Sequence, residues 1–509
     1  PLEPLIHFIY NPCFFHGSMA QGQNTMSSTF PLLLSVVSLL CFFLMLLKKK
    51  KREEENISSS LPPGPRKLPL IGNLHQLGDL PHQSLHRLSH EYGPLMFLKL
   101  GSVPTLVVSS AAMMREIFRK HDRVFSGRPI LYAGRKLSYN CSDLAFAPYG
   151  QYWREVRKIV VLELLGAKRV QFFEAIREEE VALMIRSIAH PSLNCSIDLS
   201  EMTLLLANNV ICQVAFGTKS GIGLHNTGKS KVHDILHEAQ CLLGEVNIAD
   251  FFPWMWWLNK LNGLDTRLGK IFKELDRFYD KVIEEHLDPT RPKPMHEDLV
   301  DVLLRVQKDP SQAISFSNEQ IKGVLTDMFI AGTDTSSATL VWTMAELIRN
   351  PSAMNKAQSE VRDIVKGKGK VEESDLTRFI YLKSVVKESL RLHPPAPLLV
   401  PRETIESCKV LGFEIPAQTR VFISAISLGR DPKSWENPNE FQPERFLNRD
   451  IDFKGQNFEF LPFGIGRRGC PGTSFALLLV ELALANLLYW FDWRLPEGMR
   501  AEDMNVEEA

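Results

Sequence analysis

The chain has 509 residues, of which 44% are hydrophobic and 23% are charged, so it is long and apolar enough to bury a large core. Basic and acidic residues number 59 each, and this net charge of +0 argues against nucleic acid as the main partner. The 8 cysteines are scattered, without a C-x-x-C pair or zinc-like spacing, which suits free thiols in a reducing compartment.

The N-terminal segment predicts a membrane anchor and a hinge. Residues 1–25 contain no recognisable element and form a leader that resembles a translation artefact. Residues 26–47 carry no charge and are long enough to cross a bilayer as a helix. The basic run that follows predicts residues 48–509 in the cytosol, whereas a cleaved secretory signal would carry its positive charges before the apolar run. Residues 48–65 combine this basic stop with a stiff, proline-rich hinge.

The chain after the hinge contains no linker rich in proline, glycine and serine, so we expect one large domain. Residues 95–108 predict two strands joined by a turn at residues 101–104, and residues 111–120 predict a helix. Further on, Trp153 and Arg157 lie four apart on a predicted helix and share a face. Such a pair is usually cation–π packing, but beside a dianionic cofactor it could donate hydrogen bonds to carboxylates.

Residues 168–290 predict mostly amphipathic helices, interrupted at residues 217–228. Within them, residues 251–257 are unusually aromatic and include three tryptophans. Core packing is the default explanation of such a run. With an anchor present, a loop that dips into the membrane near the substrate entrance is an equal alternative, because tryptophan prefers the membrane interface.

A long helix is predicted between the capping box of Ser317 with Gln320 and the stop at Asn350 and Pro351, and it would be roughly 48 Å long. Its middle, residues 331–336, reads Ala-Gly-Thr-Asp-Thr-Ser, and these residues weaken a helix. Three explanations compete: a packing notch, a bend caused by hydroxyls that bond back to carbonyls, and a catalytic groove in which a buried acid beside hydroxyls relays protons.

Two later segments complete the predicted elements. Glu388 and Arg391 lie three apart on one helical face, and taken alone they would form a surface salt bridge of little energetic weight. Residues 411–416 and 420–426 have strand-like patterns. The sequence therefore predicts a small sheet beside a mainly helical body.

Residues 463–472 read Phe-Gly-Ile-Gly-Arg-Arg-Gly-Cys-Pro-Gly and lie between a strand-like run, residues 458–463, and an apolar helix, residues 474–488. The four glycines allow positive φ and close approach to a flat partner. Amides that point at the sulfur of Cys470, with the N-terminus of the next helix nearby, favour the thiolate, which is the form that an iron ligand needs. A buried free cysteine is the ordinary alternative, but the glycine and arginine spacing argues against it.

This decapeptide resembles the heme-binding loop of the cytochrome P450 family, Phe-x-x-Gly-x-Arg-x-Cys-x-Gly, with every fixed position present. Residues 61–76 and 146–158 resemble the plant microsomal members. The resemblance implies a mainly α fold with small β-sheets, a long central helix over heme b, and a heme-binding catalytic domain at residues 66–509. Relatives continue beyond the position of Ala509 into a hairpin that closes the substrate pocket, so we expect a C-terminal truncation.

The resemblance also assigns site residues. It makes Cys470 the axial iron ligand, Arg468 a partner of a heme propionate, Thr335 the alcohol near bound dioxygen and Asp334 its acid partner. The other cofactor contacts that it implies are Trp153, Arg157, Ala331, Gly332, Arg402, Phe463 and Gly472.

Outside the heme contacts, the resemblance pairs Glu388 and Arg391 with Arg445 of a Pro-Glu-Arg-Phe segment, in a cluster that positions the fold and does not catalyse. His393 could serve as a second iron ligand, but the prolines that follow it favour a structural turn residue. Three basic residues are expected to dock the acidic reductase. They are Arg154, Lys158 and Arg467.

The function that the resemblance implies is a monooxygenase of the endoplasmic reticulum membrane. It would take electrons from NADPH through a flavoprotein reductase and insert one oxygen atom of O2 into a small lipophilic plant metabolite, a terpenoid, alkaloid or phenolic. Two alternatives remain: a peroxide-rearranging or dehydrating relative that needs neither O2 nor reductase, and a non-catalytic heme-binding membrane protein. The intact Thr335 and the anchor argue against the first. We expect the pocket to be lined by residues near 130–147, 240–252, 327–335 and 396–400.

Overall fold

The computed structural model describes residues 60–189, 197–218, 231–292, 296–495, 498–500 and 504. The predicted leader, anchor and basic run lie outside the described residues. The chain divides into two compact units, Pro1–Leu61 and Pro62–Ala509. The second unit is mainly helical with two small sheets, as the sequence predicted.

Helices make up most of the described chain, and one of them is much longer than the others. In chain order they are α2 (Pro81–Tyr92), α3 (Ala111–His121), α4 (Tyr132–Leu137), α5 (Gln151–Ile159), α6 (Ala167–Phe172), α7 (Glu174–Ile188), α8 (Leu199–Phe216), α9 (Lys231–Gly244), α10 (Ile248–Phe251), α11 (Leu258–Leu261), α12 (Leu264–Leu287), α13 (Leu299–Lys308), α14 (Asn318–Arg349), α15 (Pro351–Val365), α16 (Tyr381–Leu392), α17 (Ala425–Gly429) and α18 (Thr473–Trp490).

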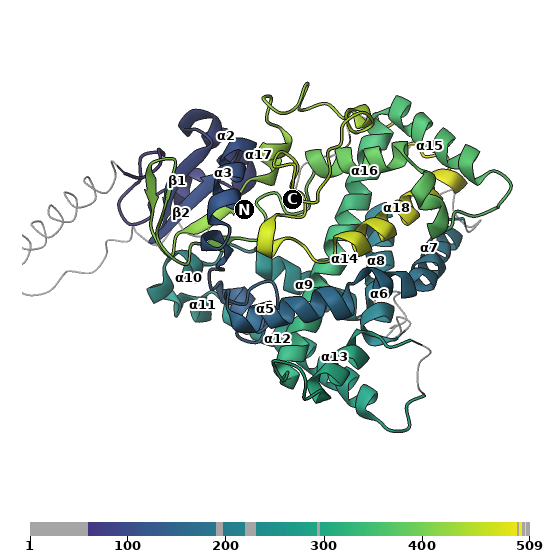
Figure 1. Ribbon diagram of the computed structural model, residues 1–509, viewed down its shortest axis with the longest axis horizontal. Helices are drawn as coiled ribbons and strands as arrows, with labels where there is room; N and C mark the ends of the chain where they lie inside the picture. The colour runs from purple at the N-terminus through teal and green to yellow at the C-terminus, as the bar shows by residue number, and fades with distance from the viewer. Residues whose placement is uncertain are drawn as a thin grey trace, which may run out of the picture. The chain divides into compact units, whose positions relative to one another are not determined.

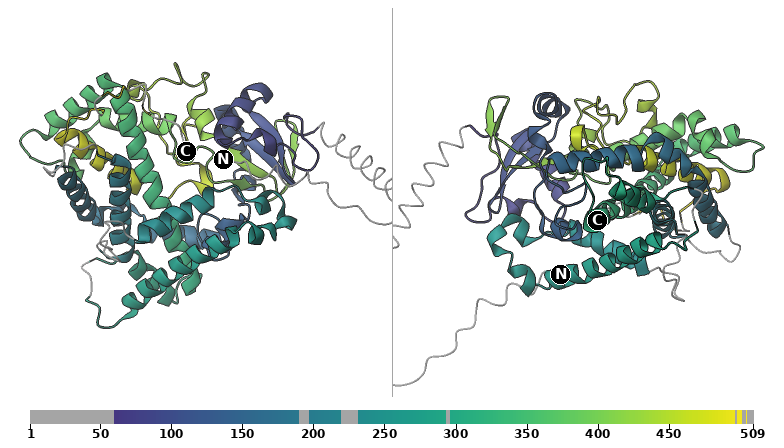
Figure 2. Two further views of the ribbon diagram at one scale, coloured as in Figure 1. Left: turned by 180° about the vertical axis from the view of Figure 1, so that it is seen from behind. Right: turned by 60° about the horizontal axis from the view of Figure 1, so that its bottom comes forward.

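The larger sheet has the strand order β1-β2-β6-β3. Strands β1 (Leu95–Leu100) and β2 (Val103–Val108) form an antiparallel hairpin, which confirms the predicted strand pair. Strand β6 (Arg420–Ile423) lies parallel to β2, and β3 (Arg402–Glu403) pairs with β6 in the antiparallel sense. In the second unit, this sheet with α2 and α3 lies at one end, and α7, α15 and α18 lie at the other (Figure 1 and Figure 2).

A second sheet consists of β4 (Cys408–Val410) and β5 (Phe413–Ile415). The strand predicted at residues 420–426 is shorter than expected and ends at Ile423. The reason is local, because the hydroxyl of Ser424 accepts a hydrogen bond from the amide of Ser427 and so begins α17.

The described end of the predicted hinge, residues 62–65, is non-helical, as expected. The amide of Phe97 in β1 donates to the carbonyl of Pro63 at 2.9 Å. A Cβ at Gly64 would lie 2.0 Å from the carbonyl oxygen of Phe97, so only glycine allows this close approach. These four residues are therefore fixed against the sheet.

Helix α14 has 32 residues and both of its predicted ends. The hydroxyl of Ser317 accepts from the amide of Gln320 and the side chain of Gln320 accepts from the amide of Ser317, which confirms the capping box. At the other end, the side chain of Asn350 donates to the carbonyl of Glu346 at 2.8 Å. Figure 1 shows α14 running through the helical part with α8 beside it.

Two of the described helices, α8 and α18, are long and apolar enough to cross a membrane by length and composition alone. However, 61% of the apolar window of α8 and 56% of that of α18 are buried inside the molecule. Both helices supply buried side chains to the main hydrophobic core, together with α14. Their apolar character is therefore explained by core packing.

Candidate active site

The loop before Cys470 is built from turns. The strand predicted at residues 458–463 is wrong, because this segment forms successive turns with no strand partner. Gly464 and Gly466 have φ of 72° and 65°, which only glycine adopts easily. Gly469 and Gly472 have negative φ, so the expected need for glycine holds for two of the four positions.

The amides of Gly472 and Thr473 act on the Cys470 thiol as hydrogen-bond donors, and Arg157 lies close enough to act on it electrostatically. The hydroxyl of Thr473 donates to the carbonyl of Cys470 at 3.2 Å. The Cys470 side chain is exposed in this structure, yet desolvation raises the pKa of its thiol, and these groups offset that effect only in part. That the loop favours the thiolate stays a prediction. A metal cation at the sulfur would displace the proton outright.

Three buried arginines from distant segments form a second feature, which we call the arginine cluster: Arg128, Arg402 and Arg468. Their exposed fractions are 8%, 3% and 8%. Their side chains donate only to backbone carbonyls among the described residues, and none of the three makes an ion pair there. The accepting carbonyls belong to Phe125, Ser126, Leu144, Ala145, Ala147, Val400, Pro401 and Ile465.

Burial and the repulsion between neighbouring guanidinium groups lower the pKa values in the arginine cluster. Burial, followed by the charge of Arg402, lowers the pKa of Arg468 to about 9. Burial lowers the pKa of Arg402 to about 10, and burial with its two positive neighbours lowers that of Arg128 well below its usual value. Positive charge is thus concentrated here without a carboxylate bound directly to it.

This arrangement fits the two propionates of a heme. Arg157 makes no hydrogen bond or ion pair with another described residue, and it is close enough to both Cys470 and Arg468 to interact with them electrostatically. The indole N–H of Trp153 donates to the carbonyl of Leu144 at 3.0 Å, and its ring lies 4.3 Å from the guanidinium of Arg468. A propionate contact from Trp153 would therefore require exchange of that hydrogen bond.

The sequence did not single out Arg128, although its guanidinium is central to the cluster. It lies in a segment rich in turn formers, where no helical or strand period marks a residue as buried. A basic residue in such a segment is usually a solvated one. Its hydrogen bonds go to the carbonyls of Val400 and Pro401, just before β3, and to that of Ala145, all of which are distant in the sequence.

A pair of buried acids lies next to the arginine cluster. Asp327 of α14 accepts hydrogen bonds from the amides of Leu144 and Ala145 at 2.6 and 3.1 Å. Asp143 accepts from the amide of Phe146 at 3.0 Å and is hydrogen-bonded to Asp327. Burial raises the pKa of Asp327 to about 6 and that of Asp143 well above its usual value, which indicates a shared proton.

The middle of α14 presents one exposed stripe, consisting of Ala331, Asp334 and Thr335. The hydroxyl of Thr335 donates to the carbonyl of Ala331 at 2.7 Å, which confirms back-bonding by the hydroxyls. A Cβ at Gly332 would lie 2.7 Å from the Ile211 side chain of α8, so the packing notch is present too. The back-bonding and the packing notch are therefore both present. The exposed stripe remains available for the third explanation, a catalytic groove.

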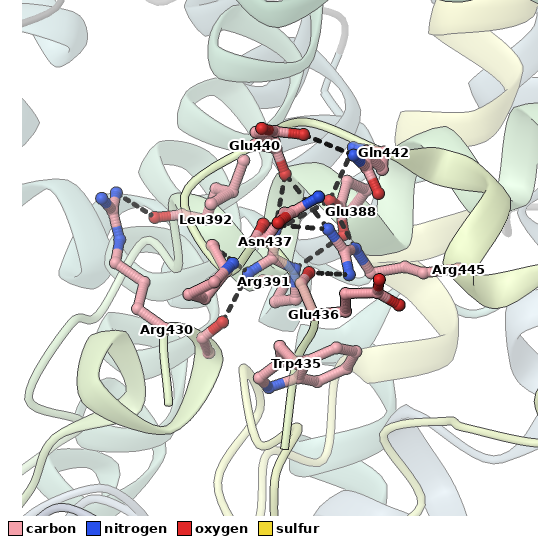
Figure 3. Close-up of polar contacts among 12 residues, drawn as sticks. Glu388, Arg391, Leu392, Arg430, Trp435, Glu436, Asn437, Glu440, Gln442 and Arg445 are labelled. Carbon is pink, nitrogen blue, oxygen red and sulfur yellow. Dashed lines mark hydrogen bonds and ion pairs between the residues drawn. The ribbon is translucent and has the colours of Figure 1, made fainter. Parts of the chain in front are cut away.

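The cluster of Glu388, Arg391 and Arg445 is drawn in Figure 3. Arg391 donates to both oxygens of Glu388 at 2.7 and 2.8 Å, and the Nε of Arg445 donates to Oε1 of Glu388 at 2.9 Å. The ring of Trp435 lies 5.3 Å from the Arg391 guanidinium. Glu388 and Arg391 are fully enclosed, so this is no surface pair. The structure brings together the three side chains that the sequence had linked.

His393 lies at the C-terminal end of α16. Its Nε2 is 2.8 Å from Oε1 of Glu346 in α14, and its ring stacks on Trp342 at 4.0 Å. This side chain ties α16 to α14, which suits a structural residue and not an iron ligand.

Comparisons with known proteins show the family of this chain. The Cytochrome P450 family model matches residues 62–508. The chain belongs to the cytochrome P450 family. Strychnine-11-hydroxylase of Strychnos nux-vomica is 60% identical over 452 residues, covering 89% of this chain and 89% of the relative. Cytochrome P450 71A9 of Glycine max is 62% identical over 454 residues, covering 88% and 90%.

Solved structures show the same fold. A zebra fish cytochrome P450 with progesterone superposes with a TM-score of 0.70 at 27% sequence identity, covering 83% of this chain and 94% of that chain. A second structure of a zebra fish cytochrome P450, with abiraterone, gives a TM-score of 0.66 at 29% identity, covering 80% and 91%. This plant cytochrome P450 is therefore a heme-thiolate oxidoreductase of the monooxygenase class, with a small-molecule substrate and a redox partner.

Proposed function

We propose that this cytochrome P450 inserts one oxygen atom of O2 into a small lipophilic plant metabolite, a terpenoid, alkaloid or phenolic, with electrons from NADPH through a flavoprotein reductase. The second oxygen atom leaves as water, which consumes two electrons and two protons. The observation that carries the proposal is the arginine cluster. Arg128, Arg402 and Arg468 are buried and donate only to backbone carbonyls among the described residues, and Arg468 lies two residues before Cys470.

In this proposal, Cys470 holds the iron, and Arg128, Arg402, Arg468 and Arg157 hold the propionates. A thiolate-ligated heme supplies reductive cleavage of the O–O bond when it is bound. The remaining contacts follow the resemblance. They are Trp153, Ala331, Gly332, Phe463 and Gly472.

The protons would come from the exposed stripe of α14. Thr335 already donates its hydroxyl proton to Ala331, so it offers lone pairs to the groove and orients a donor there. Although Asp334 is exposed on the stripe, partial desolvation raises its pKa, which lets this carboxyl carry a proton closer to neutral pH than a fully solvated aspartate does. Asp334 is therefore the proton carrier and Thr335 the orienting group.

A reductase-docking face is supported by exposed basic residues next to the heme loop. Arg154 and Lys158 are exposed on α5, the helix that also carries Arg157. Arg467 is exposed three residues before Cys470, where it pairs with Asp122 at 3.1 Å. An acidic partner would find these cations close to the iron ligand, which favours fast association and a short electron path.

Association with the endoplasmic reticulum membrane is supported by the aromatic segment between α10 and α11. Trp254, Trp256 and Trp257 have exposed fractions of 61%, 50% and 48%, so core packing does not explain them. Exposed tryptophans in one short segment favour a membrane interface. This surface would complement the predicted anchor at residues 26–47.

The test is turnover of a metabolite panel under ¹⁸O2 with NADPH and a plant reductase, using wild type and Cys470→Ala. We expect one labelled oxygen per product from the wild type, a reduced carbon monoxide spectrum typical of thiolate ligation, and loss of both in the variant. Turnover that needs neither O2 nor reductase would instead support a rearranging or dehydrating enzyme. A carbon monoxide spectrum unchanged in Cys470→Ala would overturn the proposal.

A further inference from the structure

Helix α2 carries two histidines one turn apart, His86 and His90, which we call the histidine pair. Their rings meet edge to face, with centroids 4.7 Å apart, and their Nε2 atoms are separated by 3.4 Å. Two imidazole nitrogens that bind one zinc ion at about 2.0–2.1 Å in tetrahedral geometry lie about 3.3–3.4 Å from each other. The histidine pair therefore has the nitrogen separation that a shared metal ion requires.

The other ring nitrogen of His86 is held by α17. Its Nδ1 is 2.9 Å from the hydroxyl of Ser427, which in turn lies 2.6 Å from the hydroxyl of Ser424. We assign Nδ1 as the donor in this contact, because the Ser427 hydroxyl can donate onward to Ser424. The lone pair of the ring is then on Nε2, and metal-bound histidines in proteins use an outer hydrogen bond of this kind to fix their tautomer.

The surroundings of the histidine pair allow a cation to bind. Burial, followed by His90 and Arg430, lowers the pKa of His86 to about 4, so this ring is neutral at neutral pH. His90 is exposed, so an ion can reach the pair from solvent. It also lies in the last turn of α2, where the carbonyl end of the helix favours a cation. Because Arg430 opposes the ion, we expect weaker binding than in a closed structural zinc site.

A second group of possible metal ligands among the described residues offers a contrast. The ligand atoms of His286, Asp298 and Asp301 lie within 4.8 Å of one another. However, Arg291 forms ion pairs with both carboxylates, at 2.9 and 2.7 Å. That group already binds a cation supplied by the chain, so the histidine pair is the stronger candidate.

We propose that the histidine pair binds one divalent transition-metal ion of the zinc, copper or nickel class through its two Nε2 atoms, with water completing the coordination. Imidazole nitrogen suits these ions, and two protein ligands leave positions for water. The inference does not rest on the proposed monooxygenase function, because neither histidine belongs to the candidate active site.

The first test is calorimetric titration of the full-length holoenzyme with zinc chloride. We expect the affinity of this site to fall about 100-fold in His90→Gln, because only one ligand remains, and about tenfold in Ser427→Ala, because the outer hydrogen bond is lost. The matched control is His75→Gln, which removes an exposed histidine outside α2 and should leave the affinity unchanged.

The second test uses copper(II) as the probe and reads its ligands by electron paramagnetic resonance. We expect two imidazole nitrogens on the copper ion in the wild type and in His75→Gln, and one in His90→Gln. Equal zinc affinities in the wild type and His90→Gln, with the same copper spectrum, would overturn the inference. The two imidazoles would then be hydrogen-bonded to each other and nothing more.

Discussion

The molecule contains two buried groups of arginines that solve the problem of buried charge differently. In the first, Arg391 and Arg445 share the carboxylate of Glu388, which the chain itself provides. In the second, Arg128, Arg402 and Arg468 reach only backbone carbonyls among the described residues. The positive charge of the first group is balanced by a carboxylate of the chain, whereas the second group has no carboxylate partner among the described residues.

This difference separates structure from binding. A buried ion pair with its hydrogen bonds satisfied holds its surroundings in place and has no need of a ligand. A buried set of like charges raises the free energy of the folded protein, and binding of an anion would lower it again. The arginine cluster is therefore the proposed site of the heme propionates, whereas the Glu388 cluster holds the segment of residues 436–445 against α16.

The largest effect should come from breaking the first group. Arg391→Ala leaves the Glu388 carboxylate buried with one partner, and we expect it to lower the free energy of unfolding by about 3–5 kcal/mol. Urea denaturation and the yield of soluble protein would measure this loss. The matched control is Lys356→Ala, which breaks the exposed pair with Glu444 and should cost less than about 1 kcal/mol. Equal losses in both variants would contradict a special role for burial.

A second prediction concerns a carboxyl group that lacks an arginine. Glu481 of α18 is 9% exposed, and burial raises its pKa to about 7, against the lowering effect of Lys383 and Lys387. The folded state thus binds a proton more tightly than the unfolded chain does. The stability that this provides is complete below about pH 4.5 and is lost as the pH rises through about 7.

Glu481→Gln removes this titration, so at pH 8 the variant should be more stable than wild type by about 3 kcal/mol, with the difference vanishing near pH 4.5. Thermal unfolding across this pH range would measure it. A difference that does not depend on pH would show that Glu481 does not titrate in this interval.

The smallest stability effect is expected in the second group. In the heme-free protein, Arg468→Met relieves a buried like charge but removes hydrogen bonds to three carbonyls, of which that of Leu144 keeps Trp153 as a donor, and these effects offset to within about 1 kcal/mol. Heme affinity should nevertheless fall about 10- to 100-fold, because a charge-assisted contact to a propionate is lost. Heme titration and denaturation of the apoprotein measure the two effects separately. A loss of apoprotein stability as large as that in Arg391→Ala would remove the distinction between the groups.

The parts of the fold that depend on neighbouring residues were predictable. The caps of α14, the β1–β2 hairpin and the helix after Cys470 follow from short-range patterns, and all three are confirmed. The strand predicted at residues 458–463 is wrong, because its aromatic residues serve packing against other segments and not a ladder of hydrogen bonds. Alternation alone does not distinguish these two uses.

The sequence by itself determined the family, because its signature is a short motif, and the same motifs predict the iron ligand Cys470 and the acid–alcohol pair Asp334 and Thr335. Only the tertiary structure decided that Arg128 completes the arginine cluster and that Asp327 of α14 accepts from the amides of Leu144 and Ala145 beside it. The physical reason is that the free energy of a buried charge depends on the partners around it, and here those partners come from segments far apart in the chain.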